Sequence, residues 1–219
     1  DIAGTSVDEG GAVYRALRTC VESHTGVPIP DEVFDRWKGT GKRQAIMGLL
    51  PEAAAGEIDA VEADFTHQLL ETYRAVPPKP LPGIVDAFAE LRENGIKVAL
   101  QTGYSQEIAG PLLEQVGWSV GRDIDAVITS DLVRVSRPAP YLIFHAMEAV
   151  GVQSVSAVLV GGDTPNDLQA GTNAGARYVV GVLTGAYDAE TLGRQPHTHI
   201  LTSVAAIPEL LGLPKSVMP

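Results

Sequence analysis

The feature that most constrains the fold is a regular alternation of helix-like and strand-like segments between residues 84 and 183. Amphipathic helices are predicted over residues 84–94, 108–116, 140–150 and 168–174. Short apolar strands are predicted between them, over residues 97–101, 126–129, 158–160 and 178–183. This order predicts a parallel sheet covered by helices on both faces, with ligands bound at the carboxyl ends of the strands.

The stretch before this alternation has a different character, because it carries helix signals and no strand signal. Val13 and Leu17 share one helix face, and Gly26 ends that helix. A longer amphipathic helix is predicted over residues 58–73. The proline-rich residues 77–83 are predicted to form a stiff linker that returns the chain to the sheet.

We therefore predict an α/β protein built from two parts. Residues 1–11 and 79–219 are expected to form a Rossmann-like core with a parallel sheet. Residues 12–78 are expected to form an α-helical cap domain inserted into that core. At 219 residues the chain is long enough for one sizeable core with such an insert.

Composition narrows the classes of partner. The net charge of −11 argues against nucleic acid or an anionic membrane as a partner, so an anionic substrate needs local cations, a metal or helix N-termini. No apolar run approaches the length of a membrane span. Cys20 is the single cysteine and is best explained as a small buried residue, which suits a reducing, cytoplasmic location. His197 and His199 lack an evident third ligand, so we do not expect them to bind metal.

The first residues, Asp1-Ile2-Ala3-Gly4-Thr5, place a carboxylate on a turn of small residues. A carboxylate in this position could bind a hard cation or attack an electrophilic phosphorus atom. Taken alone, the stretch is better explained by an Asx-type turn with a helix N-cap. We also expect a buried parallel strand before Asp1, because such a strand would present the turn at the carboxyl edge of the sheet.

Three later segments place polar groups at predicted strand ends or before a helix. Asp163 follows the strand 158–160 and Asp167 lies one helical turn further on, so that their hard oxygens suit Mg²⁺. Thr102 and Gly103 offer a hydroxyl and an amide to an anionic oxygen. Arg137 precedes Pro138 and is held in an extended backbone. Each segment alone also fits an ordinary solvated loop or turn.

Together these four segments resemble the haloacid dehalogenase superfamily of aspartate-nucleophile phosphotransferases, in motif order and over most of the chain. The resemblance implies that Asp1 is the nucleophile and that Thr102, Gly103 and Arg137 hold the phosphoryl oxygens. It also implies an Mg²⁺ site formed by Asp1, the Ala3 carbonyl and Asp163, with Asp167 behind them. The helical insert is similar to the cap domain of that superfamily's first subclass.

Two departures from the general pattern point to one branch of the superfamily. Most of its phosphatases carry an acidic residue two positions after the nucleophile, where it protonates the leaving alkoxide, and Ala3 stands there instead. Arg137 replaces the usual lysine. Asp-x-Ala-Gly-Thr with Arg-Pro is similar to phosphonatases, which break a carbon–phosphorus bond. A carbon leaving group needs an electron sink more than a proton, and a lysine iminium supplies one.

The resemblance places that lysine in the cap, where Lys42 lies in the segment Gly39-Thr40-Gly41-Lys42-Arg43. Two cations at a predicted helix start are disfavoured by the helix dipole, which suggests a site for an anion. The same surroundings would lower the pKa of Lys42 and favour the free amine. We expect Gly41 and Arg43 to bind substrate beside Lys42, with Tyr104 at the border of the site. Phosphonatases carry a histidine where Ala45 stands, so another group or water must move the proton.

Our hypothesis is an Mg²⁺-dependent hydrolase that cleaves the C–P bond of a 2-oxoalkylphosphonate, through an iminium at Lys42 and an aspartyl-phosphate at Asp1. A phosphate-ester phosphatase on the same scaffold is the alternative. A noncatalytic phosphoacceptor module is a third hypothesis, although a cap that carries Lys42 would have no function in such a module. The resemblance also implies a homodimer formed through the caps.

Overall fold

The computed structural model describes residues 1–214. The strands are β1 (Val7–Asp8), β2 (Lys79–Pro80), β3 (Ala99–Gln101), β4 (Ala126–Ile128), β5 (Leu159–Gly162), β6 (Tyr178–Val182) and β7 (His199–Leu201). The α-helices are α1 (Ala12–Thr25), α2 (Asp31–Asp35), α3 (Lys42–Leu49), α4 (Ile58–Ala75), α5 (Ile84–Glu93), α6 (Gln106–Gln115), α7 (Tyr141–Ala149), α8 (Pro165–Ala174), α9 (Ala189–Gly193) and α10 (Ile207–Leu210). The 3₁₀ helices are η1 (Glu52–Glu57), η2 (Ser130–Leu132), η3 (Val155–Ala157) and η4 (Val204–Ala206).

The core contains two parallel sheets. Strands β3 and β4 pair in parallel, with Ala99 opposite Ala126. Strands β5, β6 and β7 form the second sheet in that spatial order, with Leu159 opposite Tyr178. Helix α7 packs against the first sheet and helix α8 against the second. The prediction of an α/β fold with parallel strands is therefore confirmed, although the strands form two sheets where a continuous one was expected.

A cavity of about 510 Å³ lies between β3 and β5. It is lined by Leu100 of β3, by Leu159 of β5 and by apolar side chains of α5 and α7. Asp1 also lines this cavity, and its backbone nitrogen donates a hydrogen bond to the Gly161 carbonyl at 3.0 Å. The largely apolar lining does not suit a phosphoryl group. The strand expected before Asp1 would precede the first residue of this chain, so the structure does not test it.

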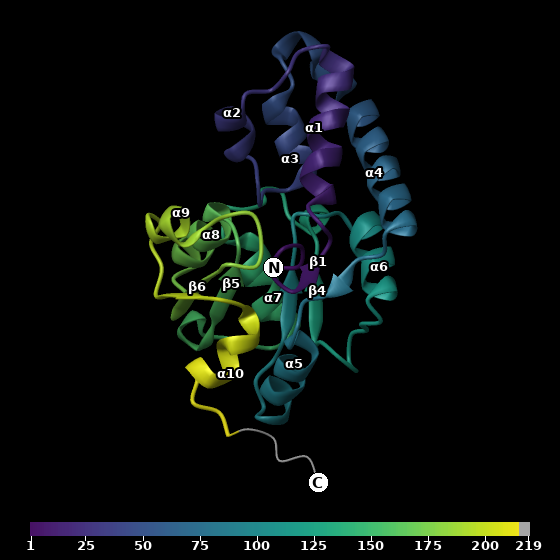
Figure 1. The fold of residues 1–219 in the computed structure, drawn as a ribbon. Coiled ribbons are helices and arrows are strands. Elements are labelled where there is room, and N and C mark those ends of the chain that lie inside the picture. Colours follow the sequence, from purple (N-terminus) through teal and green to yellow (C-terminus); the bar gives the residue numbers. More distant parts are fainter. Residues whose placement is uncertain (215–219) are drawn as a thin grey trace.

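Helices α1 to α4 lie together at one end of the molecule (Figure 1). Within the described residues, all regular structure from Ala12 to Ala75 is helical, as the sequence predicts. Helix α1 ends before Gly26, which adopts a φ of 66° that favours glycine. The apolar faces of α1 and α4 pack against each other because each helix is amphipathic. The predicted division into a cap and a core stays a prediction, because the structure shows the arrangement and not independent folding.

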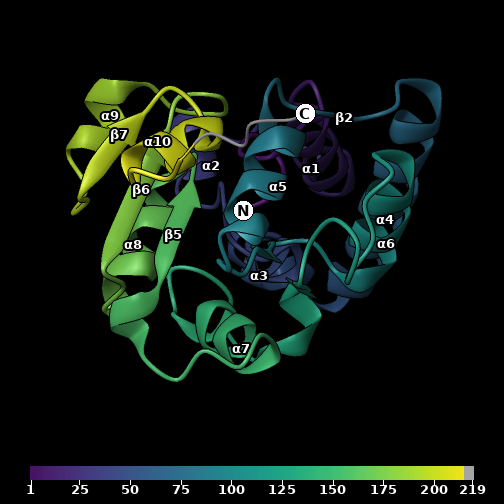
Figure 2. The same ribbon diagram turned by 90° about the horizontal axis from the view of Figure 1, so that it is seen from below.

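The two chain crossings between the helical region and the sheets run side by side. Strand β1 pairs with β2 in an antiparallel ribbon, with Val7 opposite Pro80 and Asp8 opposite Lys79. Figure 2 shows β2 on the side of the molecule that holds α1 and α4, away from β5, β6 and β7. The proline-rich linker is thus partly a strand, which the sequence analysis did not predict. A two-residue strand that contains proline gives no alternating pattern from which it could be recognised.

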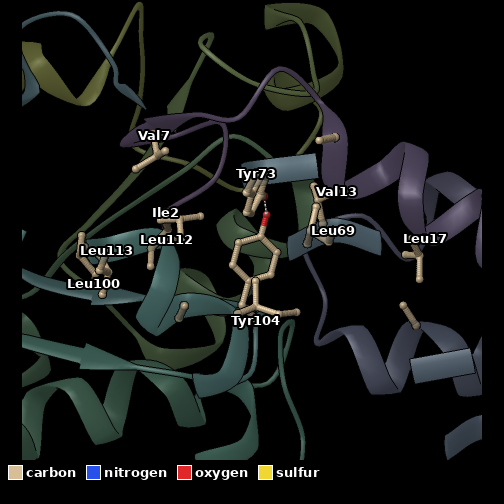
Figure 3. Close-up of a cluster of buried hydrophobic side chains, with 14 of the residues drawn as sticks. Ile2, Val7, Val13, Leu17, Leu69, Tyr73, Leu100, Tyr104, Leu112 and Leu113 are labelled. Carbon is tan, nitrogen blue, oxygen red and sulfur yellow. Dashed lines mark hydrogen bonds between the residues drawn. The ribbon is translucent and has the colours of Figure 1, made fainter. Parts of the chain in front are cut away.

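One cluster of buried side chains joins the helical region to the core (Figure 3). Val13 of α1 and Leu69 of α4 belong to the same cluster as Leu100 of β3 and Leu112 of α6. Cys20 is buried in it, in accordance with its predicted role as a small apolar residue. Within residues 1–214, none of the helices has the length and apolar character needed to cross a membrane.

Candidate active site

Three carboxylates from different parts of the chain meet at the carboxyl end of β5. Asp163 follows the last residue of β5, and Asp167 lies in the first turn of α8. Thr164 caps that helix in a capping box with Asp167, and Pro165 occupies its first turn, so the local sequence fixes both positions. One oxygen of each carboxylate, including that of Asp1, lies within 4.8 Å of the others. The structure therefore brings together the three acidic residues that the sequence placed in a metal site.

The Arg137 guanidinium lies among these carboxylates. Its Nη1 donates to Asp1 Oδ1 at 3.0 Å and also to Asp167 Oδ1. The side chain of Arg137 is only 2% exposed, and burial lowers its pKa to about 10, which still leaves it charged at neutral pH. One guanidinium facing three carboxylates leaves an excess of negative charge in a buried place. Such an excess is unfavourable unless a further cation is bound.

The residues present fit a hard divalent cation. Asp163 is buried, and burial raises the pKa of its carboxyl group, while hydrogen bonds from the Ala186 amide and the Thr5 hydroxyl oppose that rise. Oxygen donors of this kind suit Mg²⁺. The turn that carries Asp1 lies close to Asp163: a Cβ added to Gly4 would lie only 2.7 Å from Asp163 Oδ2. Asp1, Asp163 and Asp167 are the residues that could hold the ion. The Ala3 carbonyl on the same turn stays a predicted ligand.

The predicted phosphate-binding segment lies at the end of β3. The Thr102 hydroxyl accepts a hydrogen bond from the Tyr104 amide at 3.1 Å, and both residues are buried. Gly103 touches the helical region so closely that a Cβ there would clash with the Thr40 carbonyl oxygen. The Lys42 amide donates to the Gly103 carbonyl at 3.0 Å. The loop that carries Lys42 is therefore seated directly on the loop that carries Thr102.

Lys42 is buried at the start of α3, with 6% of its surface exposed. Burial, reinforced by the charge of Arg137, lowers its pKa to about 7, while the charges of Glu9 and Asp163 act in the opposite direction. Its Nζ donates to the Thr40 carbonyl at 3.1 Å and lies 5.6 Å from the centre of the Tyr104 ring. At neutral pH a substantial fraction of this amine is therefore uncharged, as a nucleophile toward a carbonyl requires.

Gly41 and Arg43 flank Lys42 but differ in where they lie. Gly41 is buried, and a Cβ on it would lie 2.9 Å from the Cβ of Ser136 next to Arg137. Arg43 is exposed and pairs with Asp59 at 2.7 Å and with Glu62 on α4. The structure thus places Gly41 at the site, whereas Arg43 faces the neighbouring helix. Substrate binding by Arg43 stays a prediction, and its present ion pairs give it no support.

Sequence reasoning missed several residues around Lys42. Tyr14 of α1 lies with its ring centre 5.5 Å from Lys42 Nζ, and its hydroxyl accepts a hydrogen bond from the Gly39 amide at 3.1 Å. The hydroxyl of Tyr73 of α4 contacts the Tyr104 hydroxyl at 2.8 Å and donates to Glu9 at 3.3 Å. Nothing in the sequence marked them, because an acidic residue before a helix and tyrosines within helices are ordinary features.

Comparison with known proteins decides the family. The model of the haloacid dehalogenase-like hydrolases matches residues 1–175. This chain belongs to the haloacid dehalogenase-like hydrolases. The resemblance found in the sequence is therefore confirmed at the level of the family.

The curated relatives of this hydrolase include a phosphonoacetaldehyde hydrolase and a phosphoglycolate phosphatase. It is 35% identical over 204 residues to a phosphonoacetaldehyde hydrolase of Parabacteroides distasonis, and these residues cover 85% of this chain and 75% of that protein. It is 29% identical over 200 residues to phosphoglycolate phosphatase 1 of Pseudomonas aeruginosa, covering 86% of this chain and 69% of that protein.

Solved structures show the same fold. A phosphonoacetaldehyde hydrolase-like protein of Oleispira antarctica matches this hydrolase with a TM-score of 0.80 at 20% identity, covering 97% of this chain and 89% of that one. A hydrolase of Pseudomonas syringae matches with a TM-score of 0.82 at 19% identity, covering 97% and 96%. At these identities the structural matches establish the fold alone.

Proposed function

We propose that this hydrolase cleaves the carbon–phosphorus bond of a 2-oxoalkylphosphonate, with phosphonoacetaldehyde or a close analogue as substrate. The observation that carries the proposal is the buried Lys42 amine, whose pKa of about 7 keeps much of it uncharged. The loop of Lys42 is seated on Gly103, beside the guanidinium that contacts Asp1. The relative of P. distasonis supports the same chemistry by its name.

The mechanism begins with attack of the Lys42 amine on the substrate carbonyl, which gives a protonated imine after loss of water. A carboxylate oxygen of Asp1 then attacks phosphorus. As the C–P bond breaks, its electron pair moves toward the iminium nitrogen and an enamine leaves. Protonation of the enamine carbon and hydrolysis of the imine release the aldehyde and the free amine. Water cleaves the aspartyl-phosphate and regenerates Asp1.

The remaining residues position and neutralise the phosphoryl group. Thr102 and the Gly103 amide offer donors at the end of β3, and Arg137 supplies a fixed positive charge next to Asp1. Asp1 and Asp163 would hold Mg²⁺, with Asp167 behind them. When bound, that ion would offset the negative charge of the phosphoryl oxygens.

The residue at position 3 agrees with this chemistry. An alkoxide leaving group benefits from a general acid, which typically contributes ~10²–10⁴-fold to the rate. Ala3 has no proton to give, and it stands two residues after Asp1 on the turn that carries the nucleophile. An enamine leaving group needs no such donor, because the iminium accepts the electron pair.

A phosphate-ester phosphatase is the second candidate. It is favoured by the similarity to phosphoglycolate phosphatase 1 of P. aeruginosa. Such an activity would use the same Asp1 nucleophile and would leave Lys42 without a chemical role. The two candidates therefore differ in whether the lysine is needed.

Phosphate release from a panel of substrates separates the two candidates. The panel should contain 2-oxoethylphosphonate and hydroxylated and carboxylated analogues, with phosphoglycolate and p-nitrophenyl phosphate as esters. We expect kcat/KM to be highest for an oxo-phosphonate, and borohydride to inactivate the enzyme by reducing an adduct at Lys42 only when that substrate is present. Higher kcat/KM for an ester, with no adduct at Lys42, would favour the phosphatase.

A further inference from the structure

Glu9 lies between β1 and α1 with its carboxylate turned toward the helical region. Its Oε2 accepts a hydrogen bond from the Val13 amide at 2.8 Å and another from the Tyr73 hydroxyl at 3.3 Å. The residue is half-buried, and desolvation raises the pKa of its carboxyl group.

Hydrogen bonds join Glu9 to Tyr73 and Tyr73 to Tyr104, whose ring lies beside Lys42. The Tyr73 hydroxyl lies 2.8 Å from the Tyr104 hydroxyl, a contact that joins α4 to the loop after β3 (Figure 3). The Tyr104 ring in turn lies beside Lys42 Nζ, at 5.6 Å. Glu9 and Lys42 also act on each other electrostatically: the carboxylate opposes the fall in the pKa of Lys42, and the amine opposes the rise in the pKa of Glu9.

The proposed reaction needs a proton donor and acceptor at this point. An amine that attacks an aldehyde forms a carbinolamine, and that carbinolamine loses its oxygen as water only when the oxygen is protonated. Position 45, where phosphonatases carry a histidine, is Ala45, which is fully buried. The proton must therefore come from water or from another titratable group within reach of Lys42.

The charges of two carboxylates, Glu9 and Asp163, raise the pKa of Lys42. These two carboxylates differ in their hydrogen-bond partners. Asp163 has one oxygen bonded to the Thr5 hydroxyl and the other to the Ala186 amide, and it belongs to the acidic cluster at Arg137. Glu9 lies outside that cluster. Its Oε2 accepts hydrogen bonds from the Val13 amide and from the Tyr73 hydroxyl.

We propose that Glu9 is the acid–base partner of Lys42, supplying and recovering the proton that condensation with a carbonyl requires. This proposal rests on the proposed function, because it assigns the proton in the lysine step of that mechanism. The Tyr73 hydroxyl bonds to Glu9 and contacts the Tyr104 hydroxyl, and the Tyr104 ring lies beside Lys42 Nζ.

The step balances as follows. The proton of the Lys42 ammonium passes to the Glu9 carboxylate, which leaves a free amine and a carboxylic acid. The amine adds to the carbonyl carbon, and its excess proton moves to the carbinolamine oxygen. Glu9 then delivers its proton to that oxygen, the C–O bond breaks, water leaves, and the nitrogen lone pair forms the C=N bond. The products are an iminium cation at Lys42, a Glu9 carboxylate and one water molecule.

The test is the rate at which acetaldehyde becomes attached to Lys42 in the presence of cyanoborohydride, followed by mass spectrometry over a range of pH. This probe carries no phosphorus, so its readout is independent of C–P cleavage. The variants are Glu9→Gln and Glu9→Asp, with Asp8→Asn as a matched control, because Asp8 is an exposed carboxylate on the neighbouring residue. Glutamine keeps the shape of Glu9 and an oxygen that accepts from Val13.

We expect Glu9→Gln to lower the maximal rate of modification ~10²-fold, with partial recovery in Glu9→Asp and no change in Asp8→Asn. The pH at which the rate rises should shift downward in Glu9→Gln. The reason is that loss of the Glu9 charge lowers the pKa of Lys42, whose other charged neighbours, Arg137 and Asp163, are retained. If Glu9 had only a structural role, Glu9→Gln would not both lower the pKa of Lys42 and slow the modification of Lys42.

Three outcomes separate this proposal from the proposed function. Equal rates of Lys42 modification in Glu9→Gln and wild type would overturn the role of Glu9, while phosphate release from 2-oxoethylphosphonate would still support C–P cleavage. Slow modification in Glu9→Gln supports the role of Glu9 even if another carbonyl compound is the substrate. No modification of Lys42 in the wild type would overturn both the lysine step and its proton donor.

Discussion

The backbone amide of Lys42 donates a hydrogen bond to the carbonyl of Gly103 at 3.0 Å. This bond joins residues 61 positions apart, one at the start of α3 and the other just after β3. It fixes the proposed amine nucleophile of the helical region against the loop proposed to bind phosphate. The loop of the proposed amine nucleophile and the loop proposed to bind phosphate are therefore held together by a backbone hydrogen bond.

That contact predicts the effect of adding a single methyl group. A Cβ at position 103 would clash with the Thr40 carbonyl oxygen, so Gly103→Ala should push the Lys42 loop away from the core. We expect kcat/KM for 2-oxoethylphosphonate to fall ~10²-fold, because small displacements of reacting groups slow reactions strongly. Gly110→Ala in α6 is the control, since its Cβ meets only the end of Gln106 at 3.4 Å. Unchanged kinetics in Gly103→Ala would contradict a close seating of the loop.

The pKa of Lys42 predicts how modification depends on pH. Burial lowers this pKa to about 7, so the amine is mostly protonated below pH 6 and mostly free above pH 8. The rate of trapping an aldehyde at Lys42 should therefore rise as the pH increases through about 7. Mass spectrometry of the reduced adduct at several pH values measures this directly. A rise centred near pH 10 would show that the amine has the pKa of an ordinary exposed lysine.

Arg137 predicts a large effect on stability. Its guanidinium contacts the carboxylates of Asp1 and Asp167, and all three side chains are nearly buried. Arg137→Met would therefore leave the two carboxylate charges uncompensated. The free energy of unfolding should fall by ~3–5 kcal/mol, measured by denaturant unfolding without metal. The control, Arg194→Met, removes an exposed pair with Glu190 and should change it by less than ~1 kcal/mol. Similar losses in both variants would contradict the electrostatic role of Arg137.

The acidic cluster predicts a response to Mg²⁺. An ion that binds only the folded protein raises its stability, by ~2.7 kcal/mol at a concentration 100 times the Kd. We expect Mg²⁺ to raise Tm in the wild type and EDTA to abolish phosphate release. Asp163→Asn should lose the rise in Tm while keeping the fold, since burial already disfavours the charge of Asp163. Asp123 is a carboxylate outside the acidic cluster, so Asp123→Asn should behave as the wild type does. An equal rise in Tm for Asp163→Asn would place the ion elsewhere.

Much of the fold could be predicted because its signals are local. Gly26 ends α1, the apolar stripe of residues 58–73 lies within α4, and the apolar run before Asp163 forms β5. Strand β2 was missed, since it is defined by its partner β1 and not by a pattern of its own. The separation of the strands into two sheets likewise depends on contacts distant in sequence.

The candidate site was predictable where a residue lies at a strand end or a helix start. Asp163 and Thr102 follow strands, and Lys42 begins a helix, so their positions follow from the order of elements. Glu9 could not be recognised, because its importance comes from Tyr73 and Tyr104, which the fold brings to it. Substrate binding by Arg43 stays a prediction, and its ion pairs with carboxylates on α4 are contacts that only the packing reveals.

The most direct test of the central claim compares Lys42→Met with the wild type in an assay that measures phosphate and aldehyde together from 2-oxoethylphosphonate. Methionine keeps most of the length of the buried side chain and removes the amine. The account predicts equimolar release of both products by the wild type and a loss of ~10³-fold or more in Lys42→Met, with phosphate-ester hydrolysis unaffected. Release of both products at the same rate by Lys42→Met, or no release by the wild type, would contradict it.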